Sequence, residues 1–218
     1  MLILLPPSEK KREPKGGGKF RLDTLSFQEE LTFSRLSVLK RYENDINLEE
    51  ISPAIDIYSG VLYQALDFRS LSQSAQRRAQ SQLIIFSALF GALRPEDLIP
   101  RYSLKIKSSD WKLPLKAALD NLERELIVDC RSSTYASAWR SDPAITVSVR
   151  VFQVRAGVRS VITHMSKKYR GELTRILVQS QAPKNPHELR NIAAKFFHVE
   201  LSEPSGALPW QLDLIISG

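Results

Sequence analysis

The chain has 218 residues, with 31 lysines and arginines against 24 aspartates and glutamates, which leaves a formal net charge of +7. Its 43% hydrophobic and 25% charged residues exclude a disordered chain, and the length suits one domain, so we assign residues 1–218 to a single domain. The single cysteine excludes a disulfide framework and a multi-thiolate metal site, and it favours a reducing, cytoplasmic location. Because the apolar stretches are shorter than 18 residues, we expect no contact with a membrane.

The predicted elements begin with an apolar run at residues 2–5, which is followed by two prolines and predicts a buried first strand. Residues 8–21 contain three consecutive glycines and predict a flexible basic loop that leads to helical segments around 26–42. Short apolar runs predict further strands at residues 82–86, 125–130, 145–152, 158–163 and 210–216.

The strand predicted at 145–152 alternates apolar and polar residues, which is typical of a half-buried strand and favours antiparallel pairing. Apolar spacing predicts helices over residues 115–126 and 189–196. A third helix is predicted over residues 163–178, with Met165, Tyr169, Leu173 and Ile176 facing the core. Interleaved strands and helices indicate one compact α/β (mixed α+β) body, with a mixed sheet and surrounding helices.

Positive charge is concentrated in two segments. Residues 8–21 carry a net charge of +4 and residues 150–175 carry +6, so the remainder is slightly acidic. On the predicted helix, Lys167 and Arg170 share one flank and Lys168 and Arg175 share another. Gly171 removes a side chain and allows a backbone or a ligand to approach. The pattern fits a helix face that contacts phosphates, and it fits equally an exposed basic face without a ligand.

Several familiar sites are missing from the sequence. Gly16 to Lys19 lack the hydroxyl residue that a phosphate-binding P-loop needs, and Asn191 stands where a zinc-protease helix needs its second histidine. Cys130 ends an apolar strand and is expected to be a buried, inert thiol. Glu96 and Asp97 follow a proline, and the start of a helix explains them more simply than an acid–base pair. We therefore expect no metal and no cofactor.

Five stretches in order resemble the YaaA family of bacterial peroxide-stress proteins. The most distinctive is FSALFGALRPEDLIPRYSLKI at residues 86–106. The others are MLILLPPSE at 1–9, YSGVLYQALD at 58–67, VDCRSSTYASAW at 128–139 and SKKYRGELTRIL at 166–177. In the first stretch Ser103 replaces the family's arginine, so Arg101 is the candidate substitute.

The resemblance implies the YaaA-like cantaloupe fold, a positively charged cleft, and protection against peroxide damage linked to intracellular iron. It also implies binding to duplex or distorted DNA without sequence preference; we expect the protein to act as a monomer. Carried onto this chain and combined with the charge pattern, it yields a list of DNA-binding candidates: Lys10, Lys19, Arg94, Arg101, Tyr102, Tyr135, Lys167, Lys168, Arg170 and Gly171.

Three functions remain open at this point. In the first, the cations contact DNA phosphates while Tyr102 and Tyr135 stack on an exposed base. In the second, the protein is an enzyme that acts on a nucleotide, a nucleobase or a nucleic acid, with Glu9, Asp97 and Lys167 as catalytic candidates. The acids have a simpler explanation, in which they pair with nearby arginines and orient them. In the third, the partner is another protein.

Overall fold

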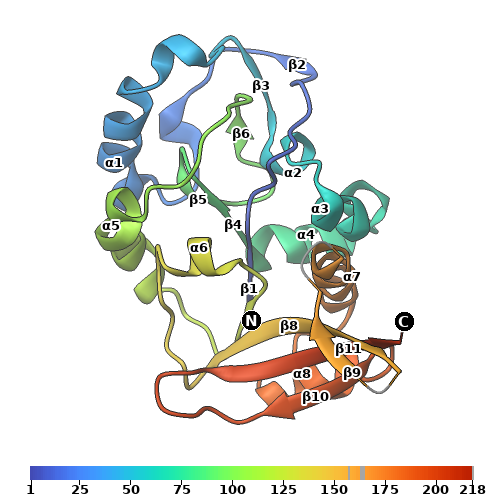
Figure 1. Ribbon diagram of the computed structural model, residues 1–218. Helices are drawn as coiled ribbons and strands as arrows, with labels where there is room; N and C mark the ends of the chain where they lie inside the picture. Colours follow the sequence, from blue (N-terminus) through green and yellow to red (C-terminus); the bar gives the residue numbers. More distant parts are fainter. Residues whose placement is uncertain (157, 163–164, 218) are drawn as a thin grey trace.

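The computed structural model describes residues 1–156, 158–162 and 165–217, and the described backbone is built around a sheet of eight strands (Figure 1). The strand order is β10–β11–β8–β7–β1–β4–β5, and β9 pairs with β8 outside this path. These strands are β1 (Leu2–Leu5), β4 (Leu83–Ser87), β5 (Gly91–Leu93), β7 (Ile127–Asp129), β8 (Thr146–Arg155), β9 (Val158–Val161), β10 (His198–Ser202) and β11 (Trp210–Ser217). A small second sheet contains β2 (Gly16–Gly17), β3 (Glu50–Pro53) and β6 (Leu98–Ile99).

The centre of the large sheet is parallel. β1 pairs in parallel with β4 on one side and with β7 on the other, and β7, β8 and β11 continue the parallel arrangement. All four residues of β1 and all five of β4 are buried. Continuous apolar sequences are what a parallel sheet covered on both faces requires, so the strands predicted at residues 2–5 and 82–86 are confirmed.

The prediction that the strand at residues 145–152 is antiparallel is wrong for its main neighbours. β8 is parallel to β7 and to β11, and it is antiparallel only to the short β9. Its alternation is present, because Val147, Val149 and Val151 are buried while Arg150 is partly exposed. Alternation of apolar and polar residues shows that one face of a strand is buried and the other exposed. The direction of the neighbouring strands depends instead on the chain segments that connect them.

Eight α-helices surround the sheet in the described part of the chain. They are α1 (Gln28–Lys40), α2 (Ala54–Ile57), α3 (Val61–Leu66), α4 (Gln73–Gln82), α5 (Ser108–Asp120), α6 (Ser133–Ala136), α7 (Ser166–Gln179) and α8 (Pro186–Ala193). Figure 1 shows α1 and α5 together on the left of the view, and α3, α4 and α7 on the right. The result is one compact α/β body with a mixed sheet, as the sequence predicts.

The predicted helices differ from the structure at their ends. The helix predicted over residues 189–196 is α8, which begins earlier, at Pro186, and ends at Ala193. α5 ends at Asp120, so the helix predicted over residues 115–126 extends too far. The backbone carbonyl of Leu126 instead accepts from Leu2 N as the chain joins the sheet. α7 confirms the basic helix in its described part, whereas Thr163 and His164 lie outside the described residues.

The loop predicted at residues 8–21 is largely irregular, but its backbone pairs with neighbouring segments at several points. The segment runs in an extended conformation beside the second sheet, where β2 pairs with β3. Arg12 N donates to Ile57 O at 2.8 Å, Lys15 N donates to Ser52 Oγ at 2.8 Å, and Phe20 N donates to Leu48 O at 2.7 Å. Glycine-rich composition predicts mobility only while the backbone lacks partners, and here the small sheet supplies them.

No helix in the described ranges is long and apolar enough to cross a membrane.

Candidate functional site

The order of the central strands changes direction at β1. From β1 the chain passes to β4 on one side and later returns to β7 on the other side. In open parallel sheets, ligands bind beyond the carboxyl ends of strands at such a reversal, because the following loops diverge there. The loops after β1, β4 and β7 are therefore the first place to look for a site.

A chain of hydrogen-bonded hydroxyl groups lies at this end of the sheet. Tyr58 Oη and Tyr102 Oη are 2.8 Å apart, and Tyr102 Oη is also 2.8 Å from Ser87 Oγ at the end of β4. Tyr63 Oη donates to the carbonyl of Pro6, just beyond β1, at 2.7 Å. Burial raises the pKa of all three phenols, so they remain protonated.

Lys11 packs over this hydroxyl chain. Its Nζ donates to Ser8 O at 3.0 Å and lies 4.5 Å from the centre of the Tyr102 ring and 5.7 Å from that of Tyr58. Burial, reinforced by the positive charge of Arg101, lowers the pKa of Lys11 to about 8, and Glu9 opposes this shift. The ammonium is thus held against aromatic rings without a carboxylate at ion-pair distance among the described residues.

Arg94 and Asp97 fasten the turn between β5 and β6, and the helix start predicted there is absent. Asp97 accepts from Arg94 N at 2.9 Å, from Ser26 N at 3.1 Å and from Ser26 Oγ at 2.8 Å. Burial raises the pKa of Asp97 despite these bonds. Arg94 Nη1 donates to the backbone carbonyls of Ser81 and Leu83, at 2.7 and 3.0 Å. Both side chains are occupied by contacts that hold the fold.

The next candidate residues along the chain differ in how far their side chains are exposed. Arg101 is exposed and pairs with Glu13 at 2.8 Å, while the adjacent Tyr102 is only 5% exposed. Phe90 makes an edge contact with the Tyr102 ring, so a stacking base would have to displace Lys11 to reach that ring. Tyr135 on α6 is partly buried, and burial raises its pKa with help from Tyr102 and Glu9 nearby.

The basic residues of α7 divide into two kinds. Lys167 and Lys168 are exposed in its first turn, and Lys168 lies 3.6 Å from Glu172. Arg170 turns inward and donates to Val149 O at 2.9 Å and to Cys130 O at 3.4 Å. Cys130 is buried as expected, and burial raises the pKa of its thiol to about 12.

Gly171 is buried where α7 crosses α3. A Cβ added there would overlap the carbonyl oxygen of Leu62 and lie 2.9 Å from the Cβ of Ala65. The sequence allows either a backbone or a ligand to approach Gly171, and in the structure it is the backbone of α3 that lies against it.

The remaining arginines of residues 150–175 are largely engaged within the protein. Arg150 and Arg159 both pair with the buried carboxylate of Asp213, and Arg159 also reaches Glu200 at 2.6 Å. Arg175 donates to the carbonyls of Leu66 and Asp67. Four of the seven basic residues of this segment thus donate to acceptors within the fold: Arg150, Arg159, Arg170 and Arg175.

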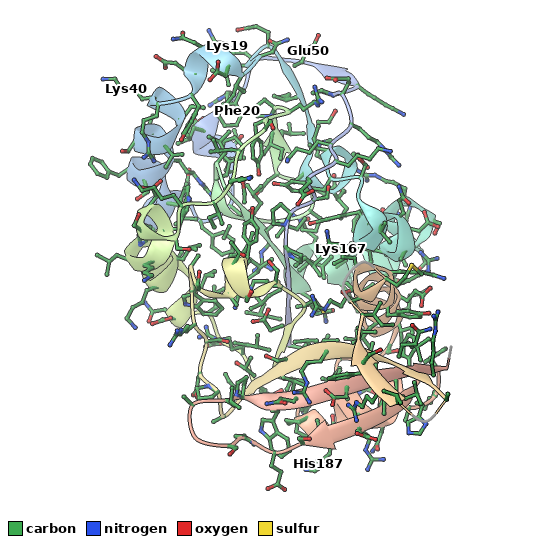
Figure 2. All side chains as sticks on the ribbon, in the orientation of Figure 1. Lys19, Phe20, Lys40, Glu50, Lys167 and His187 are labelled. Atoms are coloured by element: carbon green, nitrogen blue, oxygen red, sulfur yellow. The ribbon has the colours of Figure 1, made fainter. Side chains whose placement is uncertain are left out.

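The DNA-binding candidates do not converge on one place. Glu9, Lys10 and Lys19 are exposed on the N-terminal segment. Figure 2 shows Lys19 at the top of the molecule and Lys167 beside α7 near the middle of the view. Sequence reasoning missed Lys11, Tyr58, Tyr63 and Ser87. The two tyrosines lie in one of the family-like stretches, whereas nothing in the sequence distinguishes Lys11 from Lys10.

Across the described ranges, no three histidine, cysteine, aspartate or glutamate side chains gather as metal ligands would.

Comparison with known proteins assigns the family. Residues 1–202 match the family described as peroxide stress protein YaaA. The chain belongs to this family. A UPF0246 protein of Streptomyces coelicolor is 34% identical, and the alignment covers 99% of this chain and 98% of that protein. A UPF0246 protein of Corynebacterium glutamicum is 34% identical over 88% of this chain and 90% of that protein. An uncharacterized protein of Campylobacter jejuni is 29% identical over the same shares.

Proposed function

We propose that this YaaA-family protein binds DNA in the bacterial cytoplasm without sequence preference and thereby limits peroxide damage. The observation that carries the proposal is a set of exposed lysines with free ammonium groups. In the described structure, Lys10, Lys15, Lys19 and Lys167 are exposed and have no carboxylate within ion-pair distance. Lys168 adds a fifth cation, because its contact with Glu172 is long and exposed.

The free lysines favour contacts with phosphates over contacts with base edges. Lysine acts as a flexible point charge, whereas recognition of guanine favours a bidentate arginine fork. Of the three candidate arginines, Arg94 and Arg170 donate to backbone carbonyls, and Arg101 pairs with Glu13. Binding should therefore tolerate any sequence and weaken strongly as salt increases.

The aromatic part of the proposal rests on Tyr135. Its ring is partly exposed on α6, while Tyr102 is covered. Stacking of an unpaired base on a tyrosine is worth about 1–3 kcal/mol, so a bubble or single strand should bind more tightly than a duplex.

The experiment measures binding to duplex, bubble and single-stranded DNA at several salt concentrations. Lys167→Gln combined with Lys168→Gln should reduce the slope of log affinity against log salt by about 1–2 and weaken all sequences alike. Arg170 is kept in this variant because its guanidinium donates to backbone carbonyls just after β7 and within β8, and its removal could disturb the fold.

A control removes the same charge elsewhere. Lys112 on α5 and Lys195 beyond α8 are both exposed, so Lys112→Gln with Lys195→Gln alters the net charge equally. The control should keep the wild-type slope. If both double variants behave alike, the binding follows net charge only and the proposed contacts are rejected.

A further inference from the structure

A second group of residues lies apart from the free lysines and is arranged for a smaller ligand. Lys11 and the tyrosines Tyr58, Tyr63, Tyr102 and Tyr135 form this lysine–tyrosine cluster. We propose that the cluster is a binding site for a small organic phosphate of the nucleotide class, with Lys11 Nζ holding the phosphate. The proposal goes beyond DNA binding and does not depend on it.

The position of the cluster supports a site. Lys11 follows β1, Ser87 ends β4, and Tyr135 follows β7, so the cluster gathers groups from the three strands at which the sheet order reverses. The chain Tyr58–Tyr102–Ser87 is fully buried and uses its hydroxyls internally. These hydrogen bonds hold the two tyrosine rings in place beneath Lys11.

The donors that remain free point to an anion. Lys11 Nζ has three hydrogens, and within the described residues Ser8 O is the one acceptor that it contacts. The phenol of Tyr135 likewise makes no hydrogen bond with the described residues. Arg101 adds a second positive charge close enough to lower the pKa of Lys11. An ammonium and a phenol, both partly buried and short of acceptors, would gain charge-assisted bonds from a phosphate.

Glu9 narrows the class of ligand. Its carboxylate is close enough to act electrostatically on both Lys11 and Tyr135. A carboxylate repels bare phosphate but accepts hydrogen bonds from hydroxyl or amino groups. A ligand that carries a phosphate together with sugar hydroxyls and a flat ring satisfies Lys11, Glu9 and Tyr135 at once. Inorganic phosphate alone does not.

Proton linkage provides a readout specific to Lys11. The charged groups that act on it are Arg101 after β6 and Glu9 from its own segment, and the rings that it overlies are those of Tyr58 after α2 and Tyr102 after β6. The pKa of Lys11 is about 8 without a ligand, and a bound phosphate would raise it. Binding above pH 8 should therefore take up a proton, and affinity should fall as pH rises.

The experiment titrates the full-length protein with AMP, adenosine and inorganic phosphate by calorimetry at pH 7.0 and 9.5, in two buffers of different ionisation enthalpy. AMP should bind at least tenfold more tightly than either fragment. Its affinity should fall about tenfold between the two pH values, with proton uptake at pH 9.5.

Substitutions then assign the effect to Lys11. Lys11→Met should weaken AMP at least tenfold at pH 7.0, whereas Lys10→Met, at the exposed neighbour, should change it less than twofold. Lys11→Arg keeps the positive charge and should abolish the pH dependence, which separates loss of the anion contact from misfolding. Lys167→Gln with Lys168→Gln should leave AMP binding unchanged, so failure of the DNA proposal can be distinguished from failure of this one.

Three results would overturn the proposal. The first is AMP binding that is equal in wild type and Lys11→Met. The second is an affinity that does not change between pH 7.0 and 9.5. The third is inorganic phosphate that binds as tightly as AMP, because the nucleoside part would then make no contact.

Discussion

Residues 8–21 carry a net charge of +4 and residues 150–175 carry +6, and the structure places the charges of the two segments differently. In the first segment the backbone pairs with neighbouring strands, while Lys10, Lys15 and Lys19 project into solvent. In the second, Arg150, Arg159 and other arginines bind carboxylates and carbonyls within the fold. The first segment thus keeps most of its lysines at the surface. In the second, the arginines cross-link the fold, and Lys167 and Lys168 are its exposed lysines.

The kind of cation explains the difference. Arginine has a planar fork of donors that satisfies carbonyl and carboxylate oxygens inside a protein, and it stays charged there. Lysine is strongly hydrated and is costly to bury, so it usually remains at the surface. Lys11 is the exception in the first segment, and its lowered pKa records that cost. The number of positive residues is therefore a poorer guide to binding than their identity.

The largest effect that would test this comparison is expected at Asp213. Its side chain is 4% exposed and pairs with Arg150 and Arg159, so Asp213→Asn would leave Arg150 without a counter-charge and Arg159 with Glu200 alone. We expect the free energy of unfolding to fall by about 3–4 kcal/mol, measured by urea denaturation. The matched control is Glu13→Gln, which breaks the exposed pair with Arg101 and should cost less than about 1 kcal/mol. Equal losses would show that the two regions do not differ.

The next effect concerns the stability of the protein at alkaline pH. The folded-state pKa of Lys11 lies near 8, below the ordinary value of 10.5, so between these values the unfolded chain binds more protons. The free energy of unfolding of wild type should therefore rise with pH through this window, by about 2–3 kcal/mol relative to Lys11→Met. Lys10→Met supplies the control, and its curve should run parallel to that of wild type. If the difference in free energy of unfolding between wild type and Lys11→Met does not change with pH, Lys11 is not a buried ammonium with a lowered pKa.

The smallest effect compares two glycines. Gly171→Ala forces a methyl group into the backbone of α3 and should lower the free energy of unfolding by about 1–2 kcal/mol, even though alanine favours a helix. Gly17 lies in the N-terminal basic segment, where an added Cβ meets nothing within 4 Å, so Gly17→Ala should be close to neutral. Thermal and urea unfolding of both variants would measure the difference, and a harmless Gly171→Ala would argue against the close crossing of α3 and α7.

The local pattern of apolar residues predicted those helices and strands whose buried face can be recognised from their own sequence. The apolar runs of β1 and β4 and the spacing along α7 are examples, because a continuous or periodic apolar face has to be covered in any fold. The direction of β8 and the end of α5 could not be predicted in this way. Both depend on where the chain goes next, and residues 8–21 likewise acquire order only from strands formed elsewhere.

The sequence by itself determined the family, the central buried strands, the basic helix and the inert Cys130. Each of these depends on residues that are close together in the chain or on a motif that is read in order. Only the tertiary structure decided which cations stay free, because Arg94 and Arg170 find acceptors on distant segments. It alone brought Lys11, Ser87, Tyr102 and Tyr135 together. Contacts between residues far apart in the sequence carry no local pattern, so neither the burial of a charge nor its partner can be inferred before the strands are ordered.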